Sequence, residues 1–311
     1  MKPKVFIDGK EGTTGLQIYD RLSQRDDIEL LLIPEEQRKD LALRSEYINA
    51  ADLVFLCLPD GAAQMAVSMV QNPNTRIIDT STIHRVMSSW VYGFPELLGL
   101  RDAIVTARRV ANPGCHATGF LSVVAPLVDL ETLPADYPLT CYSLTGYSGG
   151  GKSLIAEYTD PNRNPLLAAP NIYATGLEHK HLPEMKEMAN LDFPPAFSPI
   201  LGDFYKGMAT TVLLNNRLLP GRVTAENLWE QISIYYEGSP VISVQPFGGT
   251  EPRISAEALA GSDRLEIIVS GHRHQTQLTA LFDNLGKGAS GAAVQNMNLM
   301  LGFEETRGLH L

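Results

Sequence analysis

The chain has 311 residues and a formal net charge of −10, with 44% hydrophobic and 19% charged residues. This composition excludes a disordered or collagen-like chain, and the length favours two domains or one large α/β unit. The acidic balance argues against a nucleic-acid partner, which demands a basic face. No stretch approaches the roughly 18 apolar residues that a membrane helix needs.

The first hundred residues alternate between strand and helix patterns. Apolar runs at 5–7, 28–33, 52–58, 77–79 and 104–106 predict strands. Leu16, Tyr19 and Leu22 follow at helical spacing after the first run, and an Ala/Met-rich helix pattern follows residue 61. Because these strands are continuously apolar, we expect a parallel sheet covered on both faces, as in a doubly wound nucleotide-binding domain.

The pattern changes after about residue 117. Strand patterns at 140–145, 209–215, 241–244 and 265–270 are more polar and more widely separated. They predict a mixed or antiparallel sheet with helices to one side, and therefore a second domain. Residues 284–301 predict a helix whose N-terminus is rich in small residues.

A glycine-rich loop separates the first strand from the first helix. Gly9, Gly12 and Gly15 have the spacing G-x-x-G-x-x-G, which departs from the usual dinucleotide fingerprint. Such a loop lets the backbone approach a pyrophosphate, whereas an ordinary glycine-rich turn is the alternative. The segment 33–39 after the second strand carries both acidic and basic residues, so it does not distinguish a ribose 2′-hydroxyl from a 2′-phosphate.

Cysteine usage indicates a reduced protein with one candidate nucleophile. The three cysteines show no close pairing, which argues against a disulfide scaffold or a zinc ribbon. Cys115 follows a Pro-Gly turn at the start of a helix predicted over 118–127, where the helix dipole stabilises a thiolate. Cys57 and Cys141 are interpreted as buried small hydrophobic residues. The N-terminus shows no export-signal pattern, so we expect a cytoplasmic protein.

The histidines offer a proton carrier. His179 and His181 form an H-x-H pair just before Glu184. A metal site would need a third ligand that the pattern does not supply, so we predict no metal and favour a general acid–base histidine. His272 and His274 form a second such pair, which we interpret as surface residues.

These motifs resemble the superfamily of aspartate-semialdehyde dehydrogenases and N-acetyl-γ-glutamyl-phosphate reductases along essentially the whole chain. The Tyr-Gly-x-Pro-Glu and His-Lys-His-x-x-Glu motifs resemble the short-form (type 2) reductases of arginine biosynthesis. One departure is Ser81-Thr82-Ile83-His84-Arg85, where longer members have Ser-Ala-Asp-Phe-Arg, and another is Thr145-Gly146 in place of Ser-Gly. The segments that carry the resemblance are 9–15, 79–85, 92–96, 112–115, 145–152, 179–184 and 286–289.

The resemblance implies a fold and a domain layout. The fold would be a Rossmann-like doubly wound parallel sheet, followed by an α+β catalytic and dimerisation domain with a mixed sheet. The NADP-binding domain would span 1–116 and be completed by a C-terminal helix over 286–311, and the catalytic domain would span 117–285. A homodimer or homotetramer would follow.

The resemblance also implies NADPH-dependent reductive dephosphorylation of N-acetyl-γ-glutamyl phosphate to N-acetylglutamate 5-semialdehyde. Cys115 would form a thioester, and His181 would move the proton, with His179 as the alternative. The expected substrate-binding residues are Arg85, Asn112, Lys152 and Glu184. The expected cofactor-binding residues are Gly9, Gly12, Thr13, Thr14, Gly15, Arg38, Ser81, Gly288 and Asn296.

Three other functions compete with this interpretation. An aspartate-semialdehyde dehydrogenase would use the same covalent chemistry on a substrate with a free α-amino group. A catalytically inactive NADP-binding regulator would have no need of the Cys115 and His181 pair. A metal-binding protein would need acidic or thiol ligands beside the H-x-H pairs.

Overall fold

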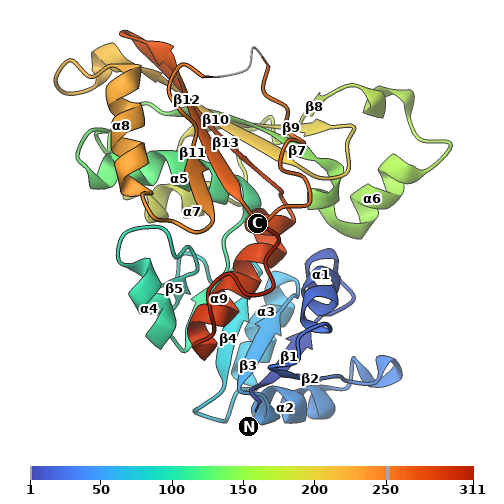
Figure 1. The fold of residues 1–311 in the computed structure, drawn as a ribbon. Helices are drawn as coiled ribbons and strands as arrows, with labels where there is room; N and C mark the ends of the chain where they lie inside the picture. Colours follow the sequence, from blue (N-terminus) through green and yellow to red (C-terminus); the bar gives the residue numbers. More distant parts are fainter. Residues whose placement is uncertain (1, 250–252) are drawn as a thin grey trace. The chain divides into compact units, whose positions relative to one another are not determined.

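A computed structural model describes residues 2–249 and 253–311. The chain divides into two compact units (Figure 1). Unit 1 runs to Pro95 and also contains Gly99–Pro113 and Ala289–Leu309. Unit 2 contains Glu96–Leu98, Gly114–Gly288 and His310–Leu311.

Unit 1 is built on a six-stranded sheet in which every paired strand is parallel. Its strands, in spatial order, are β2 (Glu29–Leu31), β1 (Lys4–Asp8), β3 (Leu53–Leu56), β4 (Arg76–Asp79), β6 (Arg109–Ala111) and β5 (Val91–Tyr92). Its helices are α1 (Thr13–Leu22), α2 (Leu41–Ala50), α3 (Asp60–Ser68), α4 (Leu100–Thr106) and α9 (Gly291–Leu301), with a 3₁₀ turn at Glu35–Gln37.

Helices cover both faces of this sheet because alternate strand residues point to opposite sides. In β1, Val5 and Ile7 pack in a cluster with residues of α1, α4 and α9. Phe6 lies between them in sequence and packs in another cluster with Ile48 of α2 and Ala66 of α3. The doubly wound parallel sheet predicted from the continuous apolar runs is therefore confirmed.

The strand predicted over 104–106 is wrong. These residues end helix α4, and the strand lies just beyond them at Arg109–Ala111. The β-branched residues favour a strand locally, but tertiary packing overrides this weak preference. Ile104 is fully buried, and the Arg76 side chain donates to the carbonyl oxygens of Val105 and Ala107 at the helix end.

The C-terminal helix ends at Leu301, as the pattern over 284–301 predicts, and is shorter than the range 286–311 that the resemblance implied. A π-helical turn at Gly286–Ser290 precedes α9, which ends at Leu301. Gly302 has a φ of 72°, a left-handed conformation that glycine adopts without strain and that closes a helix. The last nine residues after it therefore continue outside a helix.

Unit 2 contains a seven-stranded mixed sheet, as predicted. Its order is β11 (Ile242–Val244), β12 (Leu265–His272), β13 (Gln275–Phe282), β10 (Met208–Asn215), β7 (Thr140–Gly146), β9 (Ala196–Gly202) and β8 (Asn171–Ile172). The β11–β12 and β7–β9 pairs are parallel, and the other pairs are antiparallel. The helices are α5 (Cys115–Asp129), α6 (Gly151–Thr159), α7 (Leu182–Met188) and α8 (Ala225–Tyr235), with 3₁₀ turns at Tyr147–Gly150, Pro165–Ala168 and Asn216–Leu218.

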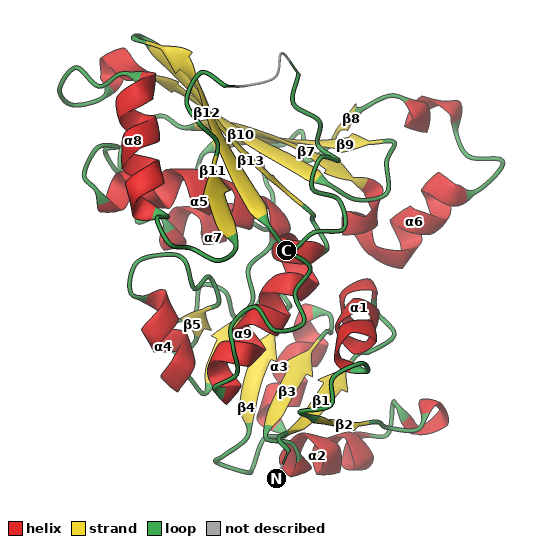
Figure 2. Cartoon of the chain, viewed as in Figure 1, coloured by secondary structure: helices red, strands yellow, loops and turns green. Residues whose placement is uncertain are grey.

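Helix α5 is the central helix of unit 2. Figure 2 shows α5, α7 and α8 on one face of the sheet, and α5 contacts β10, β13, α7 and α8. All residues from His116 to Leu127 are buried. A Cβ added at Gly119 would lie 2.3 Å from Oγ1 of Thr210 in β10, so the helix backbone rests directly on the strand. In the described residues, no helix is both long and apolar enough to cross a membrane.

We expect Gly119→Ala to destabilise the protein, because its methyl group would overlap Thr210 in a packed interface. The expected loss is about 1–3 kcal/mol, the usual cost of overpacking a core. Gly61→Ala in α3 is the matched control, since an added Cβ there meets no atom within 4 Å. Thermal unfolding should show a lower midpoint for Gly119→Ala and an unchanged or slightly higher one for Gly61→Ala. Equal midpoints for both variants would contradict this account of the interface.

Candidate functional site

The glycine-rich loop of unit 1 depends on two close backbone contacts. Gly9 directly follows β1 with a φ of +87°, and an added Cβ would lie 2.3 Å from the carbonyl oxygen of Cys57. A Cβ at Gly15 would lie 2.4 Å from the carbonyl oxygen of Gly9. Only glycine fits either position, so the loop folds tightly under the start of α1.

The start of α1 offers donors to an anion. Its N-cap is Gly12, which brings no side-chain cap, and the buried Oγ1 of Thr13 makes no hydrogen bond. Helix N-termini carry unsatisfied N–H groups and a partial positive charge, which suit a phosphate. Gly12 and Thr14 lie on the same turn. The residues present therefore fit the pyrophosphate of a dinucleotide.

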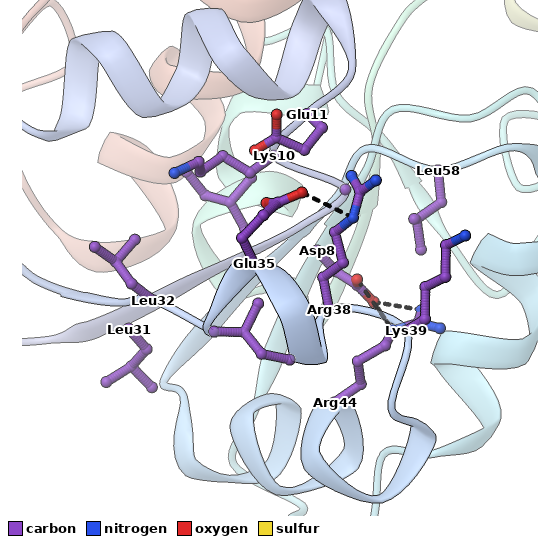
Figure 3. Close-up of a pocket in the computed structure, with 13 residues that line it drawn as sticks. Asp8, Lys10, Glu11, Leu31, Leu32, Glu35, Arg38, Lys39, Arg44 and Leu58 are labelled. Carbon is purple, nitrogen blue, oxygen red and sulfur yellow. Dashed lines mark hydrogen bonds and ion pairs between the residues drawn. The ribbon is translucent and has the colours of Figure 1, made fainter.

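A cavity of about 380 Å³ adjoins this loop (Figure 3). Arg44 lines it but is bound to the Asp8 carboxylate, with Nη2 to Oδ2 at 2.7 Å. Arg38 forms a 3.0 Å ion pair with Glu35, and both side chains are largely exposed. Exposed ion pairs contribute little, so Arg38 can exchange Glu35 for another anion. Lys39 is a further cation on this wall.

The end of β4 holds Ser81 in a fixed orientation. The buried Asp79 accepts hydrogen bonds from the Ser81 backbone N–H at 3.0 Å and from its hydroxyl at 2.5 Å. Asp79 also contacts Nδ1 of His84 at 2.5 Å, and the His84 ring stacks on Trp90 at 4.1 Å. The hydroxyl oxygen of Ser81 keeps its acceptor capacity toward a ligand.

Three further expected residues of unit 1 lie together. Arg85 is buried and donates to the carbonyl oxygens of Asn112 and Thr80, both at 3.0 Å. The Asn112 side chain donates to the Ala289 carbonyl and accepts from Asn296 at 3.2 Å. Oδ1 of Asn296 is buried and makes no hydrogen bond, so it can accept one from a bound amide. The arrangement fits the carboxamide of a nicotinamide.

In unit 2, Cys115 is the first residue of α5. Gly114 is the N-cap, and its N–H donates to Oε1 of Glu184 at 2.8 Å. Glu184 is 1% exposed, so it anchors the turn before the cysteine from within the protein. The helix begins three residues earlier than predicted, which puts Cys115 itself at the positive end of the dipole.

Three imidazole rings pack beside the start of α5. His179 and His181 are in edge contact at 4.8 Å between ring centroids. His116 contacts both rings, at 5.3 and 5.6 Å. Burial is the main reason that the pKa of His116 falls to about 3 and that of His179 to about 4. Both rings are therefore neutral at pH 7.

His116 is also the centre of a hydrogen-bond chain. Its Nδ1 lies 2.9 Å from the Ser143 hydroxyl, which lies 2.8 Å from the Thr210 hydroxyl. Its Nε2 lies 2.8 Å from the Tyr173 hydroxyl. Burial raises the pKa of Tyr173, and the charge of Cys115 adds to this shift. Sequence reasoning missed His116 and Tyr173, although His116 stands next to the cysteine.

Two further residues expected in the site belong to unit 2, and one is packed against Cys115 whereas the other is exposed. Gly288 lies against the cysteine, since an added Cβ would be 3.0 Å from Cβ of Cys115. Lys152 is an exposed residue in the first turn of α6. Within residues 2–249 and 253–311, no cluster of three or more His, Cys, Asp or Glu side chains could hold a metal ion.

The two other thiols are held in the protonated form. Burial raises the pKa of Cys57 to about 12 and also raises that of Cys141. Because the thiolate is the reactive form, neither residue is a nucleophile near neutral pH.

We expect the neutral, buried His116 to make unit 2 sensitive to acid. Its pKa is about 3 when folded and 6.5 when unfolded, so below pH 6.5 the unfolded chain binds a proton that the folded chain does not. Stability should therefore fall as the pH drops from 6.5 toward 3, by at most about 1.4 kcal/mol per pH unit for this group. Urea unfolding between pH 7 and 5 measures the slope.

His116→Gln should show a smaller slope in this series, because glutamine keeps hydrogen-bonding capacity but does not titrate. His272→Gln, at an exposed position in the same unit, is the control and should keep the parent slope. If His116→Gln keeps the parent slope as well, another group causes the acid sensitivity.

Comparisons with known proteins agree on one family. Residues 4–107 match the model of the semialdehyde dehydrogenase NAD binding domain, and residues 115–284 match that of the semialdehyde dehydrogenase dimerisation domain. Proteins named N-acetyl-gamma-glutamyl-phosphate reductase from Brucella ovis and Brucella canis are each 50% identical over 309 residues. These alignments cover 97% of this chain and 100% of either relative.

Solved structures share the fold at low identity. Aspartate semialdehyde dehydrogenase II from Vibrio cholerae, complexed with ASA, superposes with a TM-score of 0.74 at 16% identity, covering 97% of this chain and 99% of that one. Aspartate semialdehyde dehydrogenase with NADP from Candida albicans gives 0.67 at 14% identity, with the same coverage of both chains. At such identity these likenesses establish the fold.

Proposed function

This chain belongs to the family of N-acetyl-γ-glutamyl-phosphate reductases, and we propose that it reduces N-acetyl-γ-glutamyl phosphate to N-acetylglutamate 5-semialdehyde and phosphate for arginine biosynthesis. As a member of this family it is an NADP-dependent oxidoreductase. The observation that carries the proposed chemistry is Cys115 at the N-terminus of the 15-residue helix α5, with His179 and His181 packed around the next residue.

Cys115 is the proposed nucleophile. Its thiolate attacks the acyl carbon, the bond from that carbon to the phosphate oxygen breaks, and phosphate leaves with the bonding electrons. The product is a thioester on the sulfur. The N-terminus of α5 favours the thiolate, and Glu184 fixes that terminus through the Gly114 N–H.

Unit 1 is the proposed cofactor-binding domain. Gly9, Gly12, Thr13, Thr14 and Gly15 would hold the pyrophosphate. Arg38 would meet the 2′-phosphate in the cavity, with Lys39 as a second cation. Ser81 and Asn296 would adjoin the nicotinamide, and Gly288 stays a cofactor contact expected from the sequence. When bound, NADPH supplies the hydride that reduces the thioester.

The histidines are the proposed proton carriers. His181 gives a proton to the oxyanion of the reduced adduct on Cys115, which becomes a thiohemiacetal, and takes the proton back as the carbon–sulfur bond breaks. That break releases the aldehyde and restores the thiolate. His179, neutral at pH 7 and partly buried, would contact the substrate.

Cations must offset the charge of the departing phosphate. Lys152 is exposed in the first turn of α6, so we assign it to the substrate phosphate. Arg85 binds two backbone carbonyl oxygens, so we assign it to holding the segment around Asn112 for substrate binding.

An assay with NADPH and two acyl phosphates tests the proposed reaction. We expect oxidation of NADPH with N-acetyl-γ-glutamyl phosphate and little with β-aspartyl phosphate. A preference for β-aspartyl phosphate would instead make the chain an aspartate-semialdehyde dehydrogenase. Binding of NADPH without turnover of either substrate would favour the inactive regulator.

Self-association is supported by the match of unit 2 to a dimerisation domain. Tyr142 and Leu213 lie on the same face of the sheet, opposite to the face that α5 covers, and both are more than a third exposed. We therefore propose a homodimer or homotetramer, which analytical ultracentrifugation distinguishes. The expected cytoplasmic location stays a prediction.

Cys115→Ser should abolish turnover while cofactor binding stays nearly unchanged. A hydroxyl near neutral pH is a far poorer nucleophile than a thiolate. Steady-state rates in both directions and titration of NADPH fluorescence measure the two effects. Cys141→Ser is the matched control and should keep its activity, because that buried thiol takes no part in the chemistry. More than a few per cent of parental activity in Cys115→Ser would exclude Cys115 as the nucleophile.

His181→Asn should lower kcat by about 10²–10⁴-fold, the usual effect of losing acid–base assistance. It should also flatten the limb of the pH–rate profile near pH 6 to 7. His179→Asn should act mainly on KM. If His179→Asn gives the larger loss in kcat and His181→Asn leaves the pH profile intact, the two roles are exchanged.

A further inference from the structure

A buried ion pair in unit 2 joins two segments that are far apart in sequence. Nζ of Lys287 lies 2.8 Å from both carboxylate oxygens of Glu96. The side chains are 2% and 1% exposed. The proposed chemistry uses neither residue, although each belongs to a motif by which the family is recognised.

Stability alone is a weak reason for such a pair. Removing two charges from water costs several kcal/mol per ion, and the attraction between them repays this only in favourable geometry. Apolar residues of similar volume often stabilise a core equally well or better. A buried pair is better suited to fixing the relative position of the segments that carry it.

The pair holds the π-helical turn Gly286–Ser290. The start of this turn is fixed by Asp283, whose carbonyl oxygen accepts hydrogen bonds from the N–H groups of Gly286 at 3.1 Å and Gly288 at 3.0 Å. Lys287 lies between these glycines and anchors the turn to Glu96. Single π-helical turns are frequent at functional sites.

The turn touches the cysteine directly. A Cβ on Gly288 would lie 3.0 Å from Cβ of Cys115 and 3.1 Å from the carbonyl oxygen of Asp283. The Gly288 backbone is therefore one wall of the space around the Cys115 side chain. A shift of this wall would leave the cysteine room to rotate.

We propose that the Lys287–Glu96 ion pair positions Cys115. The pair holds the Gly288 backbone against the cysteine, and this contact keeps the Cys115 side chain in one orientation. The inference rests on the proposed role of Cys115 as nucleophile. Lys287 is no direct ligand of the substrate phosphate, because its ammonium group is buried and bound to both oxygens of Glu96.

The test removes both charges together, so that no unpaired charge is left in the core. The variant is Glu96→Leu/Lys287→Met. The control is Arg163→Met/Asp203→Leu, which removes a 2.6 Å ion pair of the same unit whose side chains are about 30% exposed. Phosphate release in a single turnover without cofactor reports acylation of Cys115. Steady-state kcat and KM, the NADPH dissociation constant and the thermal midpoint are measured alongside.

We expect the buried-pair variant to slow single-turnover phosphate release and kcat by about tenfold or more, since small misplacements of a reacting group are costly. KM and NADPH affinity should stay within roughly threefold, a split that general destabilisation does not produce. The control should keep its phosphate-release rate. Gly288→Ala places a methyl group against the Cys115 side chain and should slow phosphate release to a similar extent. If the double variant does not fold, Gly288→Ala and Glu96→Gln together test the inference.

Two outcomes overturn the inference. The first is that the double variant folds and releases phosphate within about twofold of the parent rate. If the double variant does not fold, the same result for both Gly288→Ala and Glu96→Gln overturns the inference. The other is a loss in kcat with unchanged phosphate release, which would place the pair in a later step. Failure of the proposed function is distinct, because then the parent chain itself would release no stoichiometric phosphate.

Discussion

The contact between helix α5 and strand β10 determines the positions of the candidate catalytic groups in unit 2. Gly119 has no side chain, so the helix lies directly on Thr210. Thr210 in turn bonds to Ser143, and Ser143 to His116. One packing interface therefore sets the depth of the helix, the orientation of the central imidazole and the place of Cys115 at the helix start. A larger residue at position 119 would disturb all three.

The elements that the sequence predicted correctly are those with strong local causes. Continuous apolar runs such as 53–56 are typical of strands that a covered parallel sheet buries on both faces, and unit 1 has that sheet. The glycine spacing of 9–15 indicated a tight loop before a helix, and the close contacts of Gly9 and Gly15 explain it. The Pro-Gly turn indicated a helix close after Cys115, and the helix of the structure begins at Cys115 itself, three residues before the predicted start. The functional roles of these residues stay predictions.

What the sequence could not predict depends on contacts between distant segments. Residues 104–106 have strand-like side chains but end a helix, because Arg76 binds the carbonyl oxygens there. Tyr173 reaches His116 from 57 positions along the chain, and Glu96 reaches Lys287 from 191 positions. No local pattern encodes such pairings. The ion pair between Arg38 and Glu35 likewise shows why the mixed charges of 33–39 did not distinguish a ribose 2′-hydroxyl from a 2′-phosphate.

The unequal surroundings of the three cysteines have a consequence for oxidative damage. Hydrogen peroxide and related oxidants attack thiolates, and the raised pKa values of Cys57 and Cys141 leave almost none of that form in the cell. Sulfenic acid formation would therefore concentrate at the helix start, where the same electrostatics that favour catalysis favour oxidation. None of the three sulfurs is bonded to another within the chain, so a repairing thiol must come from outside the folded protein. The concentration of reducing thiols around the protein would then determine how long each molecule stays active under oxidation.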